Sequence, residues 1–124
     1  MTAAELDRHR YLSLATVRRS GAEVATPVWF ANVDGRLYVV SAGDAGKVKR
    51  LRHSSGVRLA PCNARGGLRG PWQGATGRLV TDPGLIHRAH AALRAKYGWQ
   101  VRLFDLVSRL TGRAGRRAWI ELEP

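Results

Sequence analysis

A glycine-rich turn that leads into basic residues is the segment of this chain whose chemistry most suggests a ligand site. Residues 43–46 read Gly-Asp-Ala-Gly, and Lys47 and Lys49 follow on a short predicted helix. Glycines let backbone amides approach an anion, and ammonium groups on the first turn of a helix add positive charge. A nucleotide-triphosphate loop needs four residues between its glycines and a Ser or Thr after the Lys, whereas this chain has two residues and Val48. The segment therefore predicts a monophosphate site, with a solvent-exposed basic helix as the commoner interpretation on the residues alone.

Side chains for acid-base chemistry or metal binding are scarce. Only nine Asp and Glu occur, and no Gly-x-Ser-x-Gly nucleophile motif is present. His87 and His90 lie three apart on a predicted helix and can face one metal ion, but no third ligand is evident, so we expect no metal site. The lone Cys62 excludes an internal disulfide and a cysteine-based zinc cluster. An enzyme built on this chain would therefore take its reactivity from a cofactor.

Tryptophan side chains are candidate walls for a planar ligand. Trp29 stands in the run Thr-Pro-Val-Trp-Phe-Ala at residues 26–31, and Trp72 and Trp119 lie in other predicted strands. Aromatic side chains on strands more often fill a core, which is the default interpretation for all three.

Basic residues outnumber acidic ones, with 21 Lys and Arg against nine Asp and Glu and a net charge of +12. This excess suggests an anionic partner. The arginines are scattered along the chain and no known nucleic-acid-binding motif is present, so we expect no specific nucleic-acid partner and only salt-sensitive adhesion.

The sequence also predicts where the protein resides. The first ten residues are polar and charged, unlike a signal peptide, and a single thiol fits a reducing compartment. The longest mostly apolar stretch, residues 24–33, is far shorter than the roughly 20 residues that cross a bilayer. We expect a cytoplasmic protein with no membrane partner.

A single domain over residues 1–124 is predicted, because no repeat or linker divides the chain. Thr2 and Glu5 fit a capping box, which predicts a short helix that ends near Arg10. The turns Ser20-Gly21 and Asp34-Gly35 predict a three-stranded meander of residues 11–17, 23–32 and 36–41. The remaining predicted elements are helices at 47–53, 83–97 and 99–110 and strands at 56–62, 71–81 and 117–122. Strands around two or three helices suggest a small barrel.

Apolar spacing predicts which helix faces are buried. Val48 and Leu51 lie three apart on the basic helix. Asp82-Pro83 is an N-cap followed by proline at the first helical position. The expected buried positions of the two later helices are Leu85, Ile86, Ala89, Leu93 and Tyr97, and then Val101, Phe104, Leu106, Val107 and Leu110.

Six stretches of the chain occur in a familiar order. They are residues 11–16 (Tyr-Leu-Ser-Leu-Ala-Thr), 26–30 (Thr-Pro-Val-Trp-Phe), 37–41 (Leu-Tyr-Val-Val-Ser), 46–52 (Gly-Lys-Val-Lys-Arg-Leu-Arg), 57–62 (Val-Arg-Leu-Ala-Pro-Cys) and 74–79 (Gly-Ala-Thr-Gly-Arg-Leu). Their order and spacing resemble the split-barrel flavin and deazaflavin proteins, the family of pyridoxamine 5′-phosphate oxidase-like proteins. Residues 46–52 and the Ala-Pro-Cys strand look most similar to the actinobacterial subgroup that uses coenzyme F420, an 8-hydroxy-5-deazaflavin with a phosphate and an oligoglutamate tail. From residue 82 onward the chain resembles the family only as helix, helix, strand.

The resemblance implies a mainly β fold, a six-stranded split barrel of the FMN-binding type. It also implies a homodimer with two cofactor sites at the interface. The cofactor phosphate maps onto Lys47 and Lys49, with Arg50 and Arg52 as neighbours. The ring system maps onto two groups of residues, Pro27, Val28 and Trp29 in one and Ser41, Ala42 and Gly43 in the other. An acidic cofactor tail would give a use to the arginines of the loops and termini, namely Arg65, Arg69, Arg113, Arg116 and Arg117.

The implied activity is an F420-dependent oxidoreductase that transfers a hydride to a small, conjugated organic acceptor. FMN is the alternative cofactor at the same phosphate site, and a cofactor carrier without turnover, of deazaflavin or haem, is a second alternative. Pyridoxamine 5′-phosphate oxidase activity itself is disfavoured, since the chain is short for the family and lacks the expected C-terminal arginine and histidine pattern.

Overall fold

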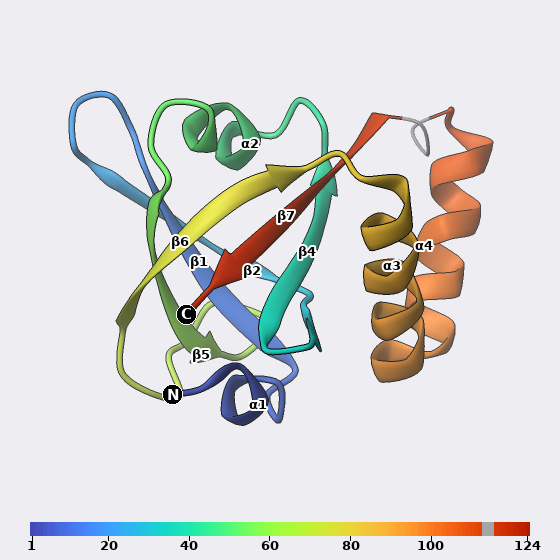
Figure 1. Cartoon of the computed structure of the whole chain (residues 1–124), viewed down its shortest axis with the longest axis horizontal. Coiled ribbons are helices and arrows are strands. Elements are labelled where there is room, and N and C mark those ends of the chain that lie inside the picture. The colour runs from blue at the N-terminus through green and yellow to red at the C-terminus, as the bar shows by residue number, and fades with distance from the viewer. Residues whose placement is uncertain (113–115) are drawn as a thin grey trace.

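The chain folds into one antiparallel sheet of seven strands with four helices around it, in a computed structural model that describes residues 1–112 and 116–124. Figure 1 shows α2 at one end of the curled sheet, α1 near the other end, and α3 and α4 together on one side. In chain order the elements are α1 (Ala3–Leu6), β1 (Tyr11–Val17), β2 (Glu23–Val28), β3 (Ala31–Val33), β4 (Arg36–Ala42), α2 (Gly46–Leu51), β5 (Gly56–Cys62), β6 (Gln73–Val80), α3 (Pro83–Tyr97), α4 (Trp99–Leu110) and β7 (Arg117–Glu123).

Local signals in the sequence place most of these elements. The capping box of α1 is confirmed, with the Thr2 hydroxyl accepting from the Glu5 N–H and the Glu5 carboxylate accepting from Thr2. Asp82 caps α3 and Pro83 occupies its first turn, as predicted. α1 stops at Leu6, short of the predicted end near Arg10, and the chain continues in tight turns in which the Arg8 and His9 N–H groups donate to the Glu5 and Leu6 carbonyls.

The strand predicted at residues 23–32 is two strands, so the sheet has seven strands rather than six. β2 ends at Val28 and β3 begins at Ala31, and Phe30 lies in the break between them. The Phe30 N–H and carbonyl both lie 3.0 Å from the Tyr97 hydroxyl, so a side chain of α3 takes the place of a neighbouring strand there. The break is therefore a consequence of α3 packing against the sheet.

Both hairpins of the predicted three-stranded meander are confirmed, but its middle strand is divided between the two edges of the sheet. The strand order is β2-β1-β5-β6-β7-β4-β3, so β2 pairs with β1 and β3 pairs with β4 at the opposite edge. β2 and β3 form the two edges of the sheet and do not pair with each other. The sheet therefore curls like a barrel but does not close. The fold class itself, a mainly β barrel-like sheet with helices, is as expected.

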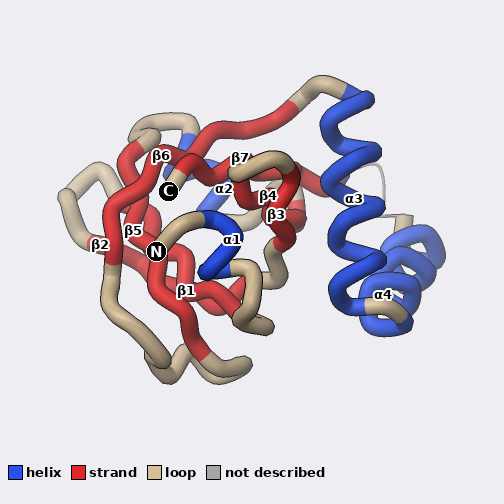
Figure 2. The backbone as a smooth tube through the Cα atoms, turned by 60° about the horizontal axis from the view of Figure 1, so that its bottom comes forward, coloured by secondary structure: helices blue, strands red, loops and turns tan. Residues whose placement is uncertain are grey.

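Two apolar cores hold the structure together. The first fills the inside of the curled sheet, with Leu14, Phe30, Val39, Leu59 and Ile120 among its members. The second lies between the outer side of the sheet and the two later helices (Figure 2), and is made of Ala31, Tyr38, Val80, Ala89, Leu93, Tyr97, Val101 and Trp119. The predicted buried face of α3 is confirmed, with Leu85 and Ile86 at its partly buried edge.

The predicted buried face of α4 is wrong in part. Val101 is buried and Phe104 half-buried, but Leu106, Val107 and Leu110 are 47%, 50% and 78% exposed. Asp105 and Ser108 face inward instead. No helix in the described ranges combines the length and the apolar character that a membrane crossing requires.

Replacing Tyr97 by phenylalanine should lower the free energy of unfolding by about 1–3 kcal/mol, because it leaves buried backbone groups of Phe30 without a partner. Urea unfolding of both proteins measures the difference. Tyr11→Phe is the matched control, since the Tyr11 hydroxyl has no hydrogen bond within the described residues, and it should change stability by less than about 0.5 kcal/mol. Equal stability of Tyr97→Phe and wild type would contradict this role of the hydroxyl.

Candidate functional site

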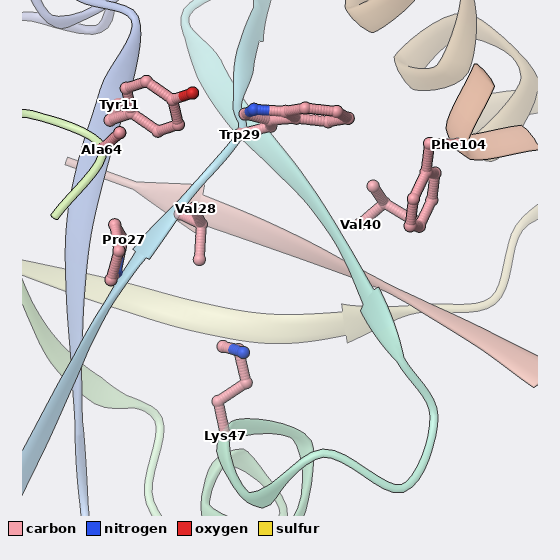
Figure 3. Close-up of a pocket in the computed structure, with 8 residues that line it drawn as sticks. All are labelled: Tyr11, Pro27, Val28, Trp29, Val40, Lys47, Ala64 and Phe104. Atoms are coloured by element: carbon pink, nitrogen blue, oxygen red, sulfur yellow. The ribbon is translucent and has the colours of Figure 1, made fainter. Parts of the chain in front are cut away.

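A cavity of about 320 Å³ opens beside β2, β4, α2 and α4. Figure 3 shows Lys47 extending from α2 toward Pro27 and Val28, with Trp29 and Phe104 farther along. The lining residues are Tyr11, Pro27, Val28, Trp29, Val40, Lys47, Ala64 and Phe104. Four of them, Pro27, Val28, Trp29 and Lys47, belong to the set predicted from the sequence.

α2 fixes the position of Lys47. Val48 and Leu51 are buried and anchor the helix on the sheet, which leaves the Lys47 side chain half-buried at the cavity. Burial, together with the charge of the nearby Arg50, lowers the pKa of Lys47 from its usual 10.5. An anionic ligand group would oppose this lowering of the Lys47 pKa, because it would pair with the ammonium group that burial disfavours.

Lys49 does not share this site. Residues two apart on a helix point to different sides, and Lys49 is exposed while Lys47 is half-buried. Arg50 also turns elsewhere, since its Nε donates to the buried Thr16 hydroxyl of β1. α2 thus brings a single ammonium group, that of Lys47, to the cavity lining.

The break between β2 and β3 presents Trp29 as a wall of the cavity. The Trp29 ring stacks on Tyr97 with a centroid distance of 5.3 Å and an angle of 23°, and it meets Phe104 edge-on at 5.9 Å. These contacts join the barrel to α3 and α4. The indole is therefore held in place by aromatic packing, which suits a surface that receives a planar ligand.

The other predicted ring and phosphate residues lie away from this cavity. Ser41 is buried, and it shares the strand parity of Val39, whose side chain belongs to the barrel core. Ala42 and Gly43 line a second cavity, of about 450 Å³, with Asp44 and Arg116. Gly43 and Arg52 line a third, of about 280 Å³.

The arginines predicted to meet an acidic tail are spread over several surfaces. Arg65 is exposed, and Arg69 lines a cavity of about 360 Å³ that shares Tyr11 and Ala64 with the main one. Arg116 lines the second and third cavities. Arg117 is ion-paired to Asp105, and Arg113 lies outside the described residues.

Sequence reasoning missed Tyr11, Val40, Ala64 and Phe104. Val40 could have been found by strand alternation, because it lies two residues from Tyr38 and faces outward with it. The sequence predicts Phe104 on the helix at residues 99–110, but no local pattern shows which element this helix packs against. Its approach to Trp29 depends on how α4 docks.

A buried carboxylate sets the orientation of α4. Asp105 is 4% exposed and accepts from Arg117 at 2.7 Å, from His90 at 2.8 Å and from Arg94 at 3.0 Å. Burial alone would raise the pKa of Asp105, but these hydrogen bonds outweigh burial and hold the pKa below its usual 3.8. The network turns Asp105 toward α3 and β7.

The cavity is suited to holding a planar anion rather than to acid-base catalysis. Its described lining residues include no carboxylate and no imidazole. His90, considered above as a metal ligand, bonds Asp105, and the described residues hold no cluster of three or more metal-binding side chains. The reactivity of such a site would come from the ligand that it holds.

Together, the curled antiparallel sheet, the two flanking helices and the lysine-bearing cavity define a barrel-like protein with a site suited to a planar, anionic ligand. The chain matches the Pyridoxamine 5′-phosphate oxidase family over residues 2–124, and it belongs to that family.

Solved structures share this fold at low sequence identity. The conserved hypothetical protein Rv2991 from Mycobacterium tuberculosis is 19% identical with a TM-score of 0.69, over 96% of this chain and 75% of that one. The heme storage protein HutZ from Vibrio cholerae is 16% identical with a TM-score of 0.70, over 98% and 86%. An F420 reductase of known structure is 17% identical with a TM-score of 0.62, over 98% of this chain and 90% of that one. No curated protein matches the chain.

Asp105→Asn should lower the free energy of unfolding at pH 7 by about 3 kcal/mol, because two arginines and a histidine lose their buried carboxylate partner. A carboxyl group whose pKa is lowered by folding stabilises the protein above its unfolded pKa, and that contribution is lost as the pH falls. The stability gap between wild type and variant should therefore narrow as the pH falls from about 5 toward 3.

Urea unfolding across this pH range measures the gap. Asp44→Asn, at an exposed position without an ion pair in the described structure, is the control and should stay close to wild type throughout. A gap for Asp105→Asn that stays constant with pH would show that the ionised carboxylate is not what holds the network.

Proposed function

We propose that the protein is a deazaflavin-dependent oxidoreductase that uses coenzyme F420 and passes a hydride to a small, conjugated organic acceptor. The observation that carries this proposal is the half-buried ammonium of Lys47 in an otherwise largely apolar cavity with a fixed indole wall. Membership of the Pyridoxamine 5′-phosphate oxidase family and the likeness to an F420 reductase of known structure support it.

The residues present fit such a cofactor. The cavity volume of about 320 Å³ lies at the lower end of the roughly 300–1,000 Å³ of ligand pockets. Trp29 and Phe104 would line the ring system, and Lys47 would pair with the phosphate. The neighbouring cavity with Arg8, Arg10 and Arg69 would suit an acidic tail.

When bound, the deazaflavin supplies hydride transfer, a two-electron step. The protein's own residues would bind the cofactor and orient it. Trp29, held between Tyr97 and Phe104, defines one plane, and Lys47 holds the charged end. Val28 and Val40 would place apolar surface beside the bound ring and so exclude water from it. Binding and orienting the cofactor needs no carboxylate, and the described residues that line the main cavity include none.

Two other functions share this site. FMN carries a phosphate too and would use Lys47 in the same way. A cofactor carrier without turnover is favoured by the structural likeness to the heme storage protein HutZ. Against haem, the described lining of the cavity holds no histidine, cysteine or methionine to serve as an axial ligand.

The assembly that we propose is a homodimer with the cofactor between two copies, acting on a small molecule. The main cavity is partly open to solvent in the single chain, and a second copy would cover this opening.

Titration of the purified protein with F420, FMN and haem, followed by fluorescence or absorbance, tests the proposal. We expect saturable F420 binding, and reduction of a nitroaromatic or enone acceptor by the reduced complex. Binding of F420 without turnover on a broad acceptor panel would favour the carrier, and binding of neither F420 nor FMN would reject the proposal.

Lys47→Ala should weaken F420 binding by about 1–3 kcal/mol, the scale of a lost charge-assisted hydrogen bond. Lys49→Ala is the matched control, because it removes an equal charge from the exposed side of the same helix and should change the affinity little. Equal losses in the two variants would mean that the overall charge of α2, not the cavity, attracts the cofactor.

The pH dependence of binding gives an independent check. Lys47 binds an anion in its charged form, and burial lowers its pKa, so cofactor affinity should decline with rising pH from a lower pH than an exposed lysine would give. Lys47→Arg keeps its charge throughout and should remove this decline. The same decline in Lys47→Arg and wild type would assign the titration to another group.

A further inference from the structure

The third cavity, of about 280 Å³, lies where α2 meets the ends of β4, β6 and β7. Figure 1 shows α2 at the end of the sheet where β6 finishes and β7 begins. Val48 and Arg52 line this cavity and, being four residues apart, lie on one face of α2, whereas Lys47 lines the main cavity. The two cavities share no described lining residue, so the third cavity is a separate place on the molecule.

The sheet creates this cavity because two of its ladders end at different points. β7 pairs with β4 as far as Arg117, which lies opposite Ala42, but with β6 only from Trp119 onward. β6 ends at Val80, and the chain turns away to begin α3. Residues 117–118 therefore have a strand neighbour on one side only, and both line the cavity.

The charge of the third cavity is positive. Arg52 and Arg116 are exposed and form no ion pair with a described residue. The Arg117 Nη1 donates to Asp105 at 2.7 Å, but the Arg117 Nε is buried and has no hydrogen-bond partner among the described residues. The described lining of the cavity includes no carboxylate. Its three guanidinium groups are thus only partly compensated.

The remaining walls of the cavity are largely apolar. Val48, Leu79, Val80 and Trp119 line it, and Thr81 adds one hydroxyl. The Trp119 ring is fixed by edge-on contact with His90, at a centroid distance of 5.7 Å. The volume lies just below the roughly 300–1,000 Å³ of ligand pockets, which suits a small molecule.

We propose that the third cavity binds a small organic anion whose phosphate or carboxylate group meets the three arginines. The planar fork of a guanidinium matches both of these groups. The apolar part of the ligand would lie against Leu79 and Trp119. This site goes beyond the proposed cofactor site and does not depend on it.

An acidic tail of a cofactor held at Lys47 is the competing occupant, and the lining residues argue against it. The cavity that contains Arg69 shares Tyr11 and Ala64 with the main cavity, so a tail can pass directly between them. The third cavity shares no described residue with either one. A separate molecule is therefore the occupant that fits.

Gly43 allows Arg116 to reach the cavity. A Cβ atom at Gly43 would collide with the carbonyl oxygen of Arg116, so the close approach of β4 and the start of β7 requires glycine here. Gly43→Ala would therefore displace Arg116 without removing any charge.

Titration of the full chain with phenyl phosphate and with benzoate, in about 0.15 M NaCl, tests the site. Backbone amide shifts in nitrogen–proton correlation NMR spectra locate the bound probe. We expect saturable shifts at residues 79–81 and 116–119, and the tighter probe tells phosphate from carboxylate recognition. Inorganic phosphate should bind at least about tenfold more weakly than phenyl phosphate, because it buries no ring.

Arg52→Gln and Arg116→Gln should each weaken binding of the tighter probe about tenfold, through loss of a charge-assisted hydrogen bond. Arg109→Gln is the matched control, because it removes an equal charge from an exposed position on α4, and it should change the affinity less than about twofold. Gly43→Ala should weaken binding although it keeps every charge. Thermal unfolding checks that each variant is folded.

The proposed cofactor site is tested apart from this one. Lys47→Ala should leave the probe-induced shifts at residues 79–81 and 116–119 unchanged, and F420 should not displace the probe from them. Displacement by F420 would make the cavity part of the cofactor site and overturn the proposal. So would the absence of saturable shifts at these residues, or equal losses in Arg109→Gln and Arg52→Gln. A protein that binds the probe here but binds no F420 would refute only the proposed function.

Discussion

The architecture depends on one hydroxyl group, that of Tyr97, within hydrogen-bond distance of the backbone N–H and carbonyl of Phe30. This contact satisfies the backbone where β2 and β3 separate, and it lets the two strands run to opposite edges of the sheet. The same tyrosine ring stacks on Trp29 and so presents the indole at the cavity. The fold and the candidate site therefore depend on the same contact, between Tyr97 of α3 and the Phe30 backbone at the break between β2 and β3.

A second buried group, the Asp105 carboxylate, decides what α4 does. By binding cations of α3 and β7 it turns the polar side of the helix inward. Phe104 then reaches the cavity, and the leucines of α4 face solvent. Because one rotation of the helix produces both results, the cavity wall and the exposed leucines are coupled. A protein that buried the leucines instead would lose the cavity wall.

Much of the fold could be predicted from the sequence, because its signals are local. The capping box at Thr2 and Glu5, the Asp82 cap and strand alternation need only neighbouring residues. The break at Phe30 could not be predicted, since its partner Tyr97 lies 67 residues away. The orientation of α4 was missed for a similar reason, because apolar periodicity cannot show that an inward aspartate will find two arginines and a histidine as hydrogen-bond partners. At the candidate site, helical geometry separates Lys47 from Lys49, although both are basic and adjacent to the same turn.

We propose that the Lys47 ammonium and the Trp29 ring together hold a planar, phosphate-bearing cofactor. A crystal structure of the protein grown with F420 tests this most directly. We expect density for the ring system against Trp29 and Phe104, with the phosphate within hydrogen-bond distance of Lys47 Nζ. Cofactor density elsewhere on the molecule, or a ring in this cavity with its phosphate turned away from Lys47, would contradict it.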